Sequence, residues 1–322
     1  MRKNKDLYKE KREGVVVRNT GSSYIVRTDD GAEVPCRIKG NFRIKGIRTT
    51  NPVATGDRVV VAKSADDADY ITEILPRKNY IIRRASNLSK ESHILASNLD
   101  LAALVVSLRE PSTPTTFIDR FLATAEAYSV PAILVINKSD MWDEDDRELA
   151  EALKILYCGI GYGVYFTSAT TGDGVAELLD ELRGKVTLFA GNSGVGKSSL
   201  INALIPGAAL KTGRISDIHH TGTHTTTFSE MLPLPGGGAL IDIPGVRGFG
   251  TIDFEPEEVS HFFPEIFRTS DGCRYGNCKH TGEPGCAVVP AVERHEISQS
   301  RYASYLSILE EIEEGDKYRK PF

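Results

Sequence analysis

The sequence predicts a doubly wound α/β domain of the P-loop class, with a small β-barrel before it and a cysteine-rich module after it. From about residue 95, near-continuous apolar segments alternate with helical ones, which is typical of a parallel sheet covered on both faces. One of these apolar segments leads into the string GNSGVGKS at residues 191–198. Before this domain, five short segments rich in β-branched residues lie between residues 14 and 75. We therefore divide the chain into residues 1–78, 79–252 and 253–322.

Length and composition agree with two or three globular domains. The chain has 322 residues, of which 40% are hydrophobic and 26% charged. No apolar run reaches the roughly 20 residues that span a bilayer. The N-terminal sequence MRKNKDLYKEKREG is charged and lacks the apolar stretch of a secretion signal. We expect a cytoplasmic protein without a membrane segment.

The first 50 residues are basic, with 13 Lys or Arg against six Asp or Glu. An Asp-Gly turn between β-branched runs is a hairpin signal, and five short strands in about 60 residues fit an OB-type barrel. Basic side chains cluster around Phe42 after the third strand: Arg37, Lys39, Arg43, Lys45 and Arg48. A basic groove with an aromatic stacking surface is typical of barrels that bind nucleic acid. There are two alternatives to nucleic-acid binding: the basic side chains form a solvated face, or the barrel serves only for packing.

The second domain is expected to begin after a basic linker at residues 76–92. Its apolar strands are predicted over residues 99–108, 131–137, 163–168, 185–191 and 239–243, and a helix over 115–128. In a sheet of this kind, ligands bind at the carboxyl ends of the strands. The motifs described next all follow such strand ends.

The string at residues 191–198 follows a strand and opens a helix, which is the context expected of a phosphate-binding loop. Its backbone N–H groups and the helix N-terminus favour phosphate. Lys197 is predicted to reach the β- and γ-phosphates, and Ser198 to bind Mg²⁺. A chance match in a loop is the alternative. The expected nucleotide contacts are Gly191, Asn192, Ser193, Gly194, Val195, Gly196, Lys197, Ser198 and Ser199.

A guanine-recognition motif is predicted in the sequence NKSD, which ends the strand at 131–137: Asn137, Lys138, Ser139 and Asp140. The Asp140 carboxylate can accept hydrogen bonds from guanine N1–H and its exocyclic amine, a pattern that adenine does not offer. Asn137 can bond the purine and tether the phosphate loop, while the Lys138 stem lies along the ring. Ser168 and Ala169 would complete the base pocket. Four residues alone match weakly, and a strand-end turn is the alternative.

The sequence DIPG supplies Asp242, which can hold Mg²⁺ through water, and Gly245, whose N–H is expected to face the γ-phosphate. A GTPase normally places its phosphate loop before the base-recognition motif, whereas here the base-recognition motif comes first. The motif order is therefore that of a circularly permuted GTPase. Ras-type enzymes place a water-orienting Gln after this Gly, but this chain has Val246.

Because valine cannot orient water, another residue is needed for hydrolysis, and the segment HHTGTHTTT at residues 219–227 supplies candidates. A Thr from this segment must close over Mg²⁺ and the γ-phosphate; Thr225 and Thr226 are the choices, and Thr226 is preferred. His224 is placed to orient or polarise water. A surface histidine in a polar loop is the alternative for His224.

A structural zinc site is predicted in the C-terminal module. Three thiolates and an imidazole within 14 residues suit tetrahedral zinc with no open position: Cys273, Cys278, His280 and Cys286. Unliganded cysteines are the alternative, and His295 is a weaker substitute for His280 because it lies outside the cluster. We expect a helix over residues 290–314. Arg268, Arg274 and Lys279 flank the cluster and are candidates to touch RNA or protein.

A permuted GTPase preceded by a barrel and followed by a C-x4-C-x-H-x5-C cluster resembles the RsgA (YjeQ) family of bacterial ribosome-assembly GTPases. The resemblance covers nearly the whole chain, except the first dozen residues. The family's NKxD, GxSGVGKS and DxPG motifs match residues 137–140, 191–198 and 242–245. Its HTTT switch, whose histidine is regarded as catalytic, matches residues 224–227.

The resemblance implies an enzyme that binds the small ribosomal subunit and its rRNA late in maturation and hydrolyses GTP to GDP when stimulated by that subunit. It also implies Mg²⁺, one zinc ion, action near the decoding region and release of an assembly factor, and it favours a monomer. Two other classes remain open from the residues alone. An RNA-binding scaffold with a degenerate nucleotide site is disfavoured by the intact Lys197, Ser198 and Asp242. A P-loop nucleotide-metabolising enzyme is disfavoured by NKSD.

Overall fold

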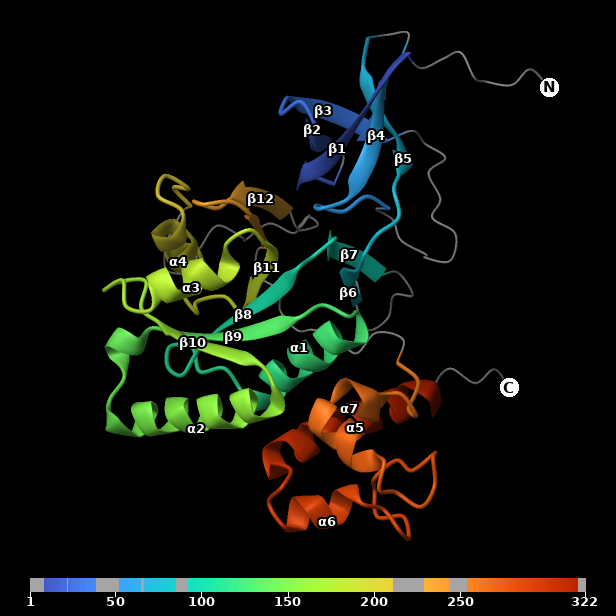
Figure 1. Cartoon of the computed structure of the whole chain (residues 1–322), viewed down its shortest axis with the longest axis vertical. Helices are drawn as coiled ribbons and strands as arrows, with labels where there is room; N and C mark the ends of the chain where they lie inside the picture. The colour runs from blue at the N-terminus through green and yellow to red at the C-terminus, as the bar shows by residue number, and fades with distance from the viewer. Residues whose placement is uncertain are drawn as a thin grey trace, which may run out of the picture.

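The computed structural model describes residues 9–21, 23–38, 52–64, 67–84, 92–210, 229–243 and 254–317. Figure 1 shows a barrel near the N-terminus, a central α/β domain, and a helical module that carries the C-terminus. The barrel and the C-terminal module contact different sides of the central domain. Within the described ranges, none of the helices has the length and apolar character needed to span a bilayer.

The central domain is built on six strands in the order β10-β9-β8-β11-β13-β12. Neighbouring strands are parallel except β12, which is antiparallel to β13. The strands are β8 (Leu101–Ser107), β9 (Ala132–Asn137), β10 (Gly163–Thr167), β11 (Val186–Gly191), β12 (Ser229–Pro233) and β13 (Ala239–Asp242). The helices are α1 (Thr115–Ala127), α2 (Glu144–Ile160), α3 (Val175–Leu182) and α4 (Lys197–Leu204), with a short helix η1 (Ser139–Met141).

Both faces of this sheet are covered, as the uniformly apolar strands predict. All residues of β8 are buried. Leu104 and Val106 belong to the core shared with α1 and α2, whereas Ala103 and Val105 belong to the core shared with α3 and α4. The alternation follows from the two-residue period of a strand. The expected α/β fold is confirmed, but the antiparallel edge strand β12 was not predicted.

The N-terminal part is a closed barrel of five strands. They are β1 (Lys9–Asn19), β2 (Tyr24–Thr28), β3 (Glu33–Ile38), β4 (Arg58–Lys63) and β5 (Asp69–Ile74). Strand β1 pairs with both β2 and β4, and β3 pairs with β5, which closes the barrel. Its interior is filled by Val16, Tyr24, Val26, Val59 and Ile71. The barrel prediction is confirmed, although β1 begins at Lys9 and is longer than expected. In the basic cluster, Arg37 is exposed, and its other members lie outside the described residues.

The expected linker at residues 76–92 is in part a strand. β6 (Tyr80–Arg84) pairs antiparallel with β7 (Ser92–Ser97) as a separate two-stranded sheet. The prediction of a linker without secondary structure was wrong here. The sequence Tyr-Ile-Ile favours a strand, and it pairs with β7 and buries Ile81 completely.

The barrel joins the central domain through a continuous sheet and a buried ion pair. Strand β1 pairs with β12, with Arg18 opposite Glu230 and Asn19 opposite Ser229. Thr55 Oγ1 lies 2.7 Å from Ser229 Oγ in a buried contact. Next to it, the buried Asp57 carboxylate accepts two 2.6 Å hydrogen bonds from the Arg77 guanidinium and one of 2.6 Å from Ser97 Oγ.

The C-terminal module contains four helices among the residues described. They are η2 (Val259–Phe262), α5 (Pro264–Ser270), α6 (Val288–Glu293) and α7 (Gln299–Lys317). The single helix expected over 290–314 was wrong, because residues 294–298 interrupt it. His295 has a φ of 60°, and the N–H groups of Glu296 and Ile297 both turn back to the carbonyl of Ala291. This bend buries Ile297 in the module's core.

A buried charge network holds the module on α1 and α2. Arg301 of α7 is 0% exposed; its Nη1 lies 2.9 Å from Asp119 of α1, and its Nε lies 2.6 Å from Glu265 of α5. Ser304 and Tyr157 donate further hydrogen bonds of 2.6 and 2.9 Å to the Asp119 carboxylate. Burial acts to lower the pKa of Arg301, but the hydrogen bonds and charges of Glu265 and Asp119 raise it. Arg301 therefore stays charged.

Replacing Arg301 by Leu should lower the free energy of unfolding by about 3–5 kcal/mol, because Asp119 would be left buried without its cation. The matched control is Arg294→Leu, since Arg294 pairs with Glu296 at the surface and should lose about 1 kcal/mol or less. Urea denaturation of both variants measures the difference. Equal losses would show that the buried network does not stabilise the protein.

Candidate nucleotide and metal sites

The phosphate-loop sequence forms a tight turn between β11 and α4. Gly194 and Gly196 have φ values of 88° and 90°, which favour glycine. A Cβ at Gly196 would collide with the Asn137 amide, and one at Gly194 would lie 3.0 Å from Pro111 Cδ. The glycines therefore permit both the turn and the close approach of two neighbouring segments.

Lys197 and Asp242 meet at the base of this loop. Lys197 is buried; its ammonium forms an ion pair with the Asp242 carboxylate and donates to the Ile243 carbonyl at 3.1 Å. Strand β13 lies beside β11, which brings the two side chains together. An ammonium suited to phosphate and a carboxylate suited to Mg²⁺ thus lie together at the sheet edge. Ser198 follows Lys197 at the start of α4.

Asn137 ties the base-recognition motif to the phosphate loop. Its Nδ2 donates to the carbonyl of Val195 at 2.9 Å, and its Oδ1 accepts from Thr167 Oγ1 at 3.1 Å. Asn137 is buried at the end of β9, so both of its amide atoms are satisfied inside the protein. The tether expected from the sequence is present.

Asp140 and Ser168 also lie together, although 28 residues separate them. Ser168 Oγ donates to Asp140 Oδ1 at 2.6 Å, and it accepts from the N–H groups of Thr170 and Thr171. The Asp140 side chain is exposed, whereas Ser168 is buried. Parallel pairing of β9 with β10 places the ends of both strands side by side, and Ala169 follows at the same edge.

One segment near this site was missed in the sequence. The loop after β8 places Pro111 against Gly194, and the Lys138 ammonium donates to the Glu110 carbonyl. Arg109 of the same loop pairs with Asp143 and Asp146 at the start of α2. No short motif marks this loop; its position after a buried strand at the carboxyl edge is the only available signal.

Several expected site residues lie outside the described ranges. They are the switch candidates His224, Thr225 and Thr226, together with Gly245 and Val246 of the segment after β13. The described residues end at Leu210 before the switch segment and resume at Ser229 after it.

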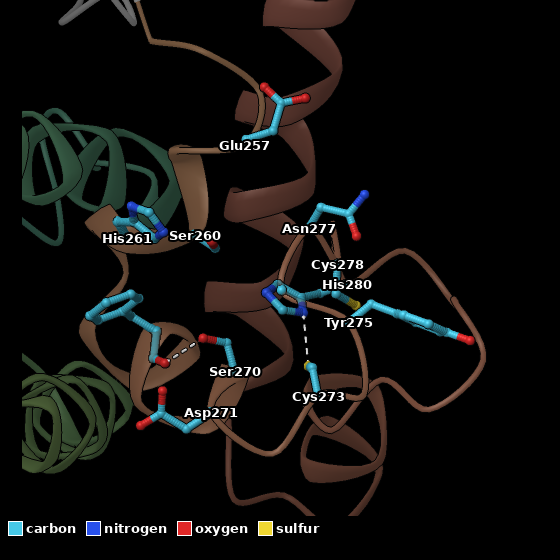
Figure 2. A pocket seen from close by; sticks show the side chains of 12 residues that line it. Glu257, Ser260, His261, Ser270, Asp271, Cys273, Tyr275, Asn277, Cys278 and His280 are labelled. Atoms are coloured by element: carbon cyan, nitrogen blue, oxygen red, sulfur yellow. Dashed lines mark hydrogen bonds between the residues drawn. The ribbon is translucent and has the colours of Figure 1, made fainter.

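The C-terminal cluster has the donors and spacing of a zinc site. The sulfur atoms of Cys273, Cys278 and Cys286 and a ring nitrogen of His280 all lie within 4.8 Å of one another. Cys273 Sγ is 3.6 Å and Cys286 Sγ 3.7 Å from His280 Nδ1. Figure 2 shows His280 pointing toward Cys273. Three thiols and an imidazole at this separation fit tetrahedral zinc, with no position left for substrate.

The surroundings of the cluster support metal binding. Burial raises the pKa of Cys278 to about 12; the His280 backbone N–H lowers it, and the Cys286 and Cys273 thiols raise it further. Tyr302 and Tyr305 of α7 donate 2.6 Å hydrogen bonds to the carbonyls of His280 and Lys279 and hold the ligand loop. His295 is exposed and is not part of the cluster, in which the imidazole is that of His280.

Comparison with protein families identifies the chain. The RsgA GTPase family matches residues 74–252, and the RsgA N-terminal domain matches residues 13–71. The chain belongs to the RsgA GTPase family. The residues that carry the two predicted nucleotide motifs and the DIPG sequence all fall within the first match.

Curated relatives and solved structures match this chain over most of its length. The small ribosomal subunit biogenesis GTPase RsgA of Bacteroides fragilis is 60% identical over 309 residues, covering 96% of this chain and 99% of the relative. The protein of the same name from Porphyromonas gingivalis is 59% identical over 315 residues, covering 96% and 100%. The crystal structure of YjeQ from Thermotoga maritima aligns with a TM-score of 0.75 at 35% identity, covering 94% and 98%. YloQ, a circularly permuted GTPase, aligns with a TM-score of 0.70 at 32% identity over 100% of both chains.

Replacing Cys273 by Ser should abolish stoichiometric zinc binding and lower the melting temperature, because the site would lose one of its four donors. The control is Cys158→Ser, since Cys158 is an exposed thiol on α2. Zinc content by atomic emission and thermal unfolding test both variants. Full zinc content in the Cys273 variant would contradict the four-donor site.

Proposed function

We propose that this RsgA-family chain is a GTPase that binds the small ribosomal subunit and assists its late maturation in the cytoplasm, hydrolysing GTP to GDP and phosphate on the subunit. The observation that carries the proposal is the bond from Asn137 to the phosphate loop, because it joins guanine recognition and phosphate binding in one site. The ribosomal partner is inferred from the names of the Bacteroides fragilis and Porphyromonas gingivalis relatives, small ribosomal subunit biogenesis GTPases.

We assign the nucleotide contacts as the sequence predicts them. Lys197 would bind the β- and γ-phosphates, while Ser198 and Thr226 would coordinate Mg²⁺ and Asp242 would hold it through water. Asp140 would select guanine. His224 would orient the attacking water, which Val246 cannot do. Bound Mg²⁺ would neutralise charge that develops on the phosphates.

The two outer modules are assigned different roles. We assign residues 1–78 to an rRNA-binding barrel, residues 79–252 to the GTPase domain and residues 253–322 to the zinc module. The barrel carries the basic cluster, including the exposed Arg37. One structural zinc ion at Cys273, Cys278, His280 and Cys286 would hold the loop of the third module. We expect a monomer, with release of an assembly factor as one result of GTP hydrolysis.

Two other classes of protein would behave differently in a hydrolysis assay. An RNA-binding scaffold would bind the subunit without measurable turnover, and a nucleotide-metabolising enzyme would use ATP and an acceptor. Hydrolysis of GTP and of ATP, each with no subunits, purified small subunits and purified large subunits, separates them. We expect stimulated hydrolysis only with GTP and small subunits. Stimulation by large subunits, or activity on ATP, would contradict the proposal.

The replacement His224→Ala should lower subunit-stimulated GTP hydrolysis at least about 100-fold while leaving GTP affinity nearly unchanged, because the imidazole is assigned to water rather than to nucleotide. His220→Ala in the same segment is the control and should retain activity. Single-turnover hydrolysis and nucleotide titration measure the two effects. Loss of affinity in the His224 variant would assign this residue to binding instead.

The replacement Asp140→Asn should weaken GTP and GDP binding about 100-fold, since two hydrogen bonds to a charged acceptor contribute at least about 3 kcal/mol. Asp145→Asn is the matched control, because Asp145 is exposed in the first turn of α2. Titration with a fluorescent guanine nucleotide measures both variants. Unchanged affinity in the Asp140 variant would remove this residue from the base site.

A further inference from the structure

A cleft lies beside the cysteine cluster and is not used in the proposed hydrolysis. It has a volume of about 320 Å³ and lies between the η2–α5 segment and the loop that carries the metal ligands. Figure 2 shows Glu257 and His261 on one side, with Asn277 and Tyr275 on the ligand-loop side. Because the volume far exceeds that of one metal ion, the cleft has room for a side chain from another molecule.

The lining of this cleft is negatively charged. Glu257 and Asp271 contribute carboxylates, and no Lys or Arg lines the cleft. No hydrogen bond or ion pair is formed by the Asp271 carboxylate among the residues described. With Zn²⁺ bound, the site of three thiolates and one neutral imidazole would carry a net charge of about −1. Phosphate is therefore disfavoured inside the cleft, and a cation is favoured.

Nearby basic side chains do not reverse this charge. The Lys279 ammonium is 2.9 Å from Glu313 and 3.9 Å from Glu257, so it is shared between two carboxylates. Arg268 donates to the Ile160 carbonyl at 3.3 Å. The Arg274 guanidinium lies 5.4 Å from the centre of the Tyr275 ring, so this cation already covers one face of that ring. Residues 254–317 hold 13 Asp or Glu against six Lys or Arg, so the module is acidic as a whole.

Aromatic rings are exposed at the same place. Five large hydrophobic side chains are exposed in the described part of the chain, and two of them line this cleft: Phe267 is 46% and Tyr275 50% exposed. The His261 ring contacts the Phe267 ring edge-on at 4.8 Å and fixes that wall. Exposed rings next to carboxylates form a surface on which a planar cation can stack.

We propose that this cleft binds an arginine side chain from a basic segment of a partner protein. A guanidinium can donate to the Glu257 or Asp271 carboxylate and stack on Phe267, or on the part of the Tyr275 ring that Arg274 does not cover, which an aliphatic side chain cannot do. The zinc module is thus a protein-binding surface, while the basic barrel is the side suited to RNA. The inference concerns binding alone and holds whether or not the catalytic assignments are correct.

The test uses the full-length, zinc-loaded protein and a labelled peptide of alternating glycine and arginine. Binding is followed by fluorescence anisotropy, with a citrulline version of the peptide as the uncharged probe. The double variant Glu257→Gln/Asp271→Asn should weaken arginine-peptide binding about tenfold. Tyr275→Leu should also weaken it, because the stacking surface is lost. The citrulline peptide should not bind.

The matched control is Glu310→Gln/Glu314→Gln, which changes the net charge equally at exposed positions of α7. This control should leave peptide affinity nearly unchanged. An equal loss of peptide affinity in both double variants would show that net charge alone explains the loss, and would overturn the proposal. Zinc content and melting temperature must stay unaltered in all variants. Binding of a short single-stranded RNA that is lost in Tyr275→Leu, while peptide binding persists, would make the cleft an RNA site instead.

Discussion

The buried carboxylate of Asp119 determines where the C-terminal module can lie. A charge without solvent is stable only with a cation and hydrogen bonds, and α7 supplies Arg301 and Ser304 for this purpose. Moving the module away from α1 would break the ion pair between Asp119 and Arg301 and the hydrogen bond from Ser304. The cysteine cluster is consequently held at a fixed place relative to the GTPase domain, and so is the acidic cleft beside it.

The barrel is joined differently, although a buried acid is again central. The Asp57 carboxylate accepts hydrogen bonds from the Arg77 guanidinium and the Ser97 hydroxyl. Thr55 contacts Ser229, the first residue of β12. Ser229 is the second residue after the segment 219–227, which contains His224 and Thr226. The barrel therefore contacts the strand next to the switch candidates, whereas the zinc module is attached to α1 and α2. Of the two attachments, the one at β12 is better placed to respond to nucleotide.

Much of the site could be predicted because its residues follow strand ends, and parallel strands bring their ends together. Lys197 meets Asp242, and Asp140 meets Ser168, for this reason. Apolar runs likewise predicted the buried sheet, and cysteine spacing predicted the cluster around His280. Features that depend on tertiary contacts could not be predicted. The Arg109–Pro111 loop has no motif, and the break in the expected C-terminal helix depends on where Ile297 finds a buried position.

The pairing of β1 with β12 has a consequence for partner choice. A strand at the edge of a sheet presents unpaired N–H and C=O groups, and another protein can add its own strand there. In this chain the beginning of β12, at Ser229 and Glu230, already pairs with Arg18 and Asn19. A partner that recognised this edge would first have to displace the protein's own barrel. A partner strand would therefore compete for this position with β1, which belongs to the same chain and is always present.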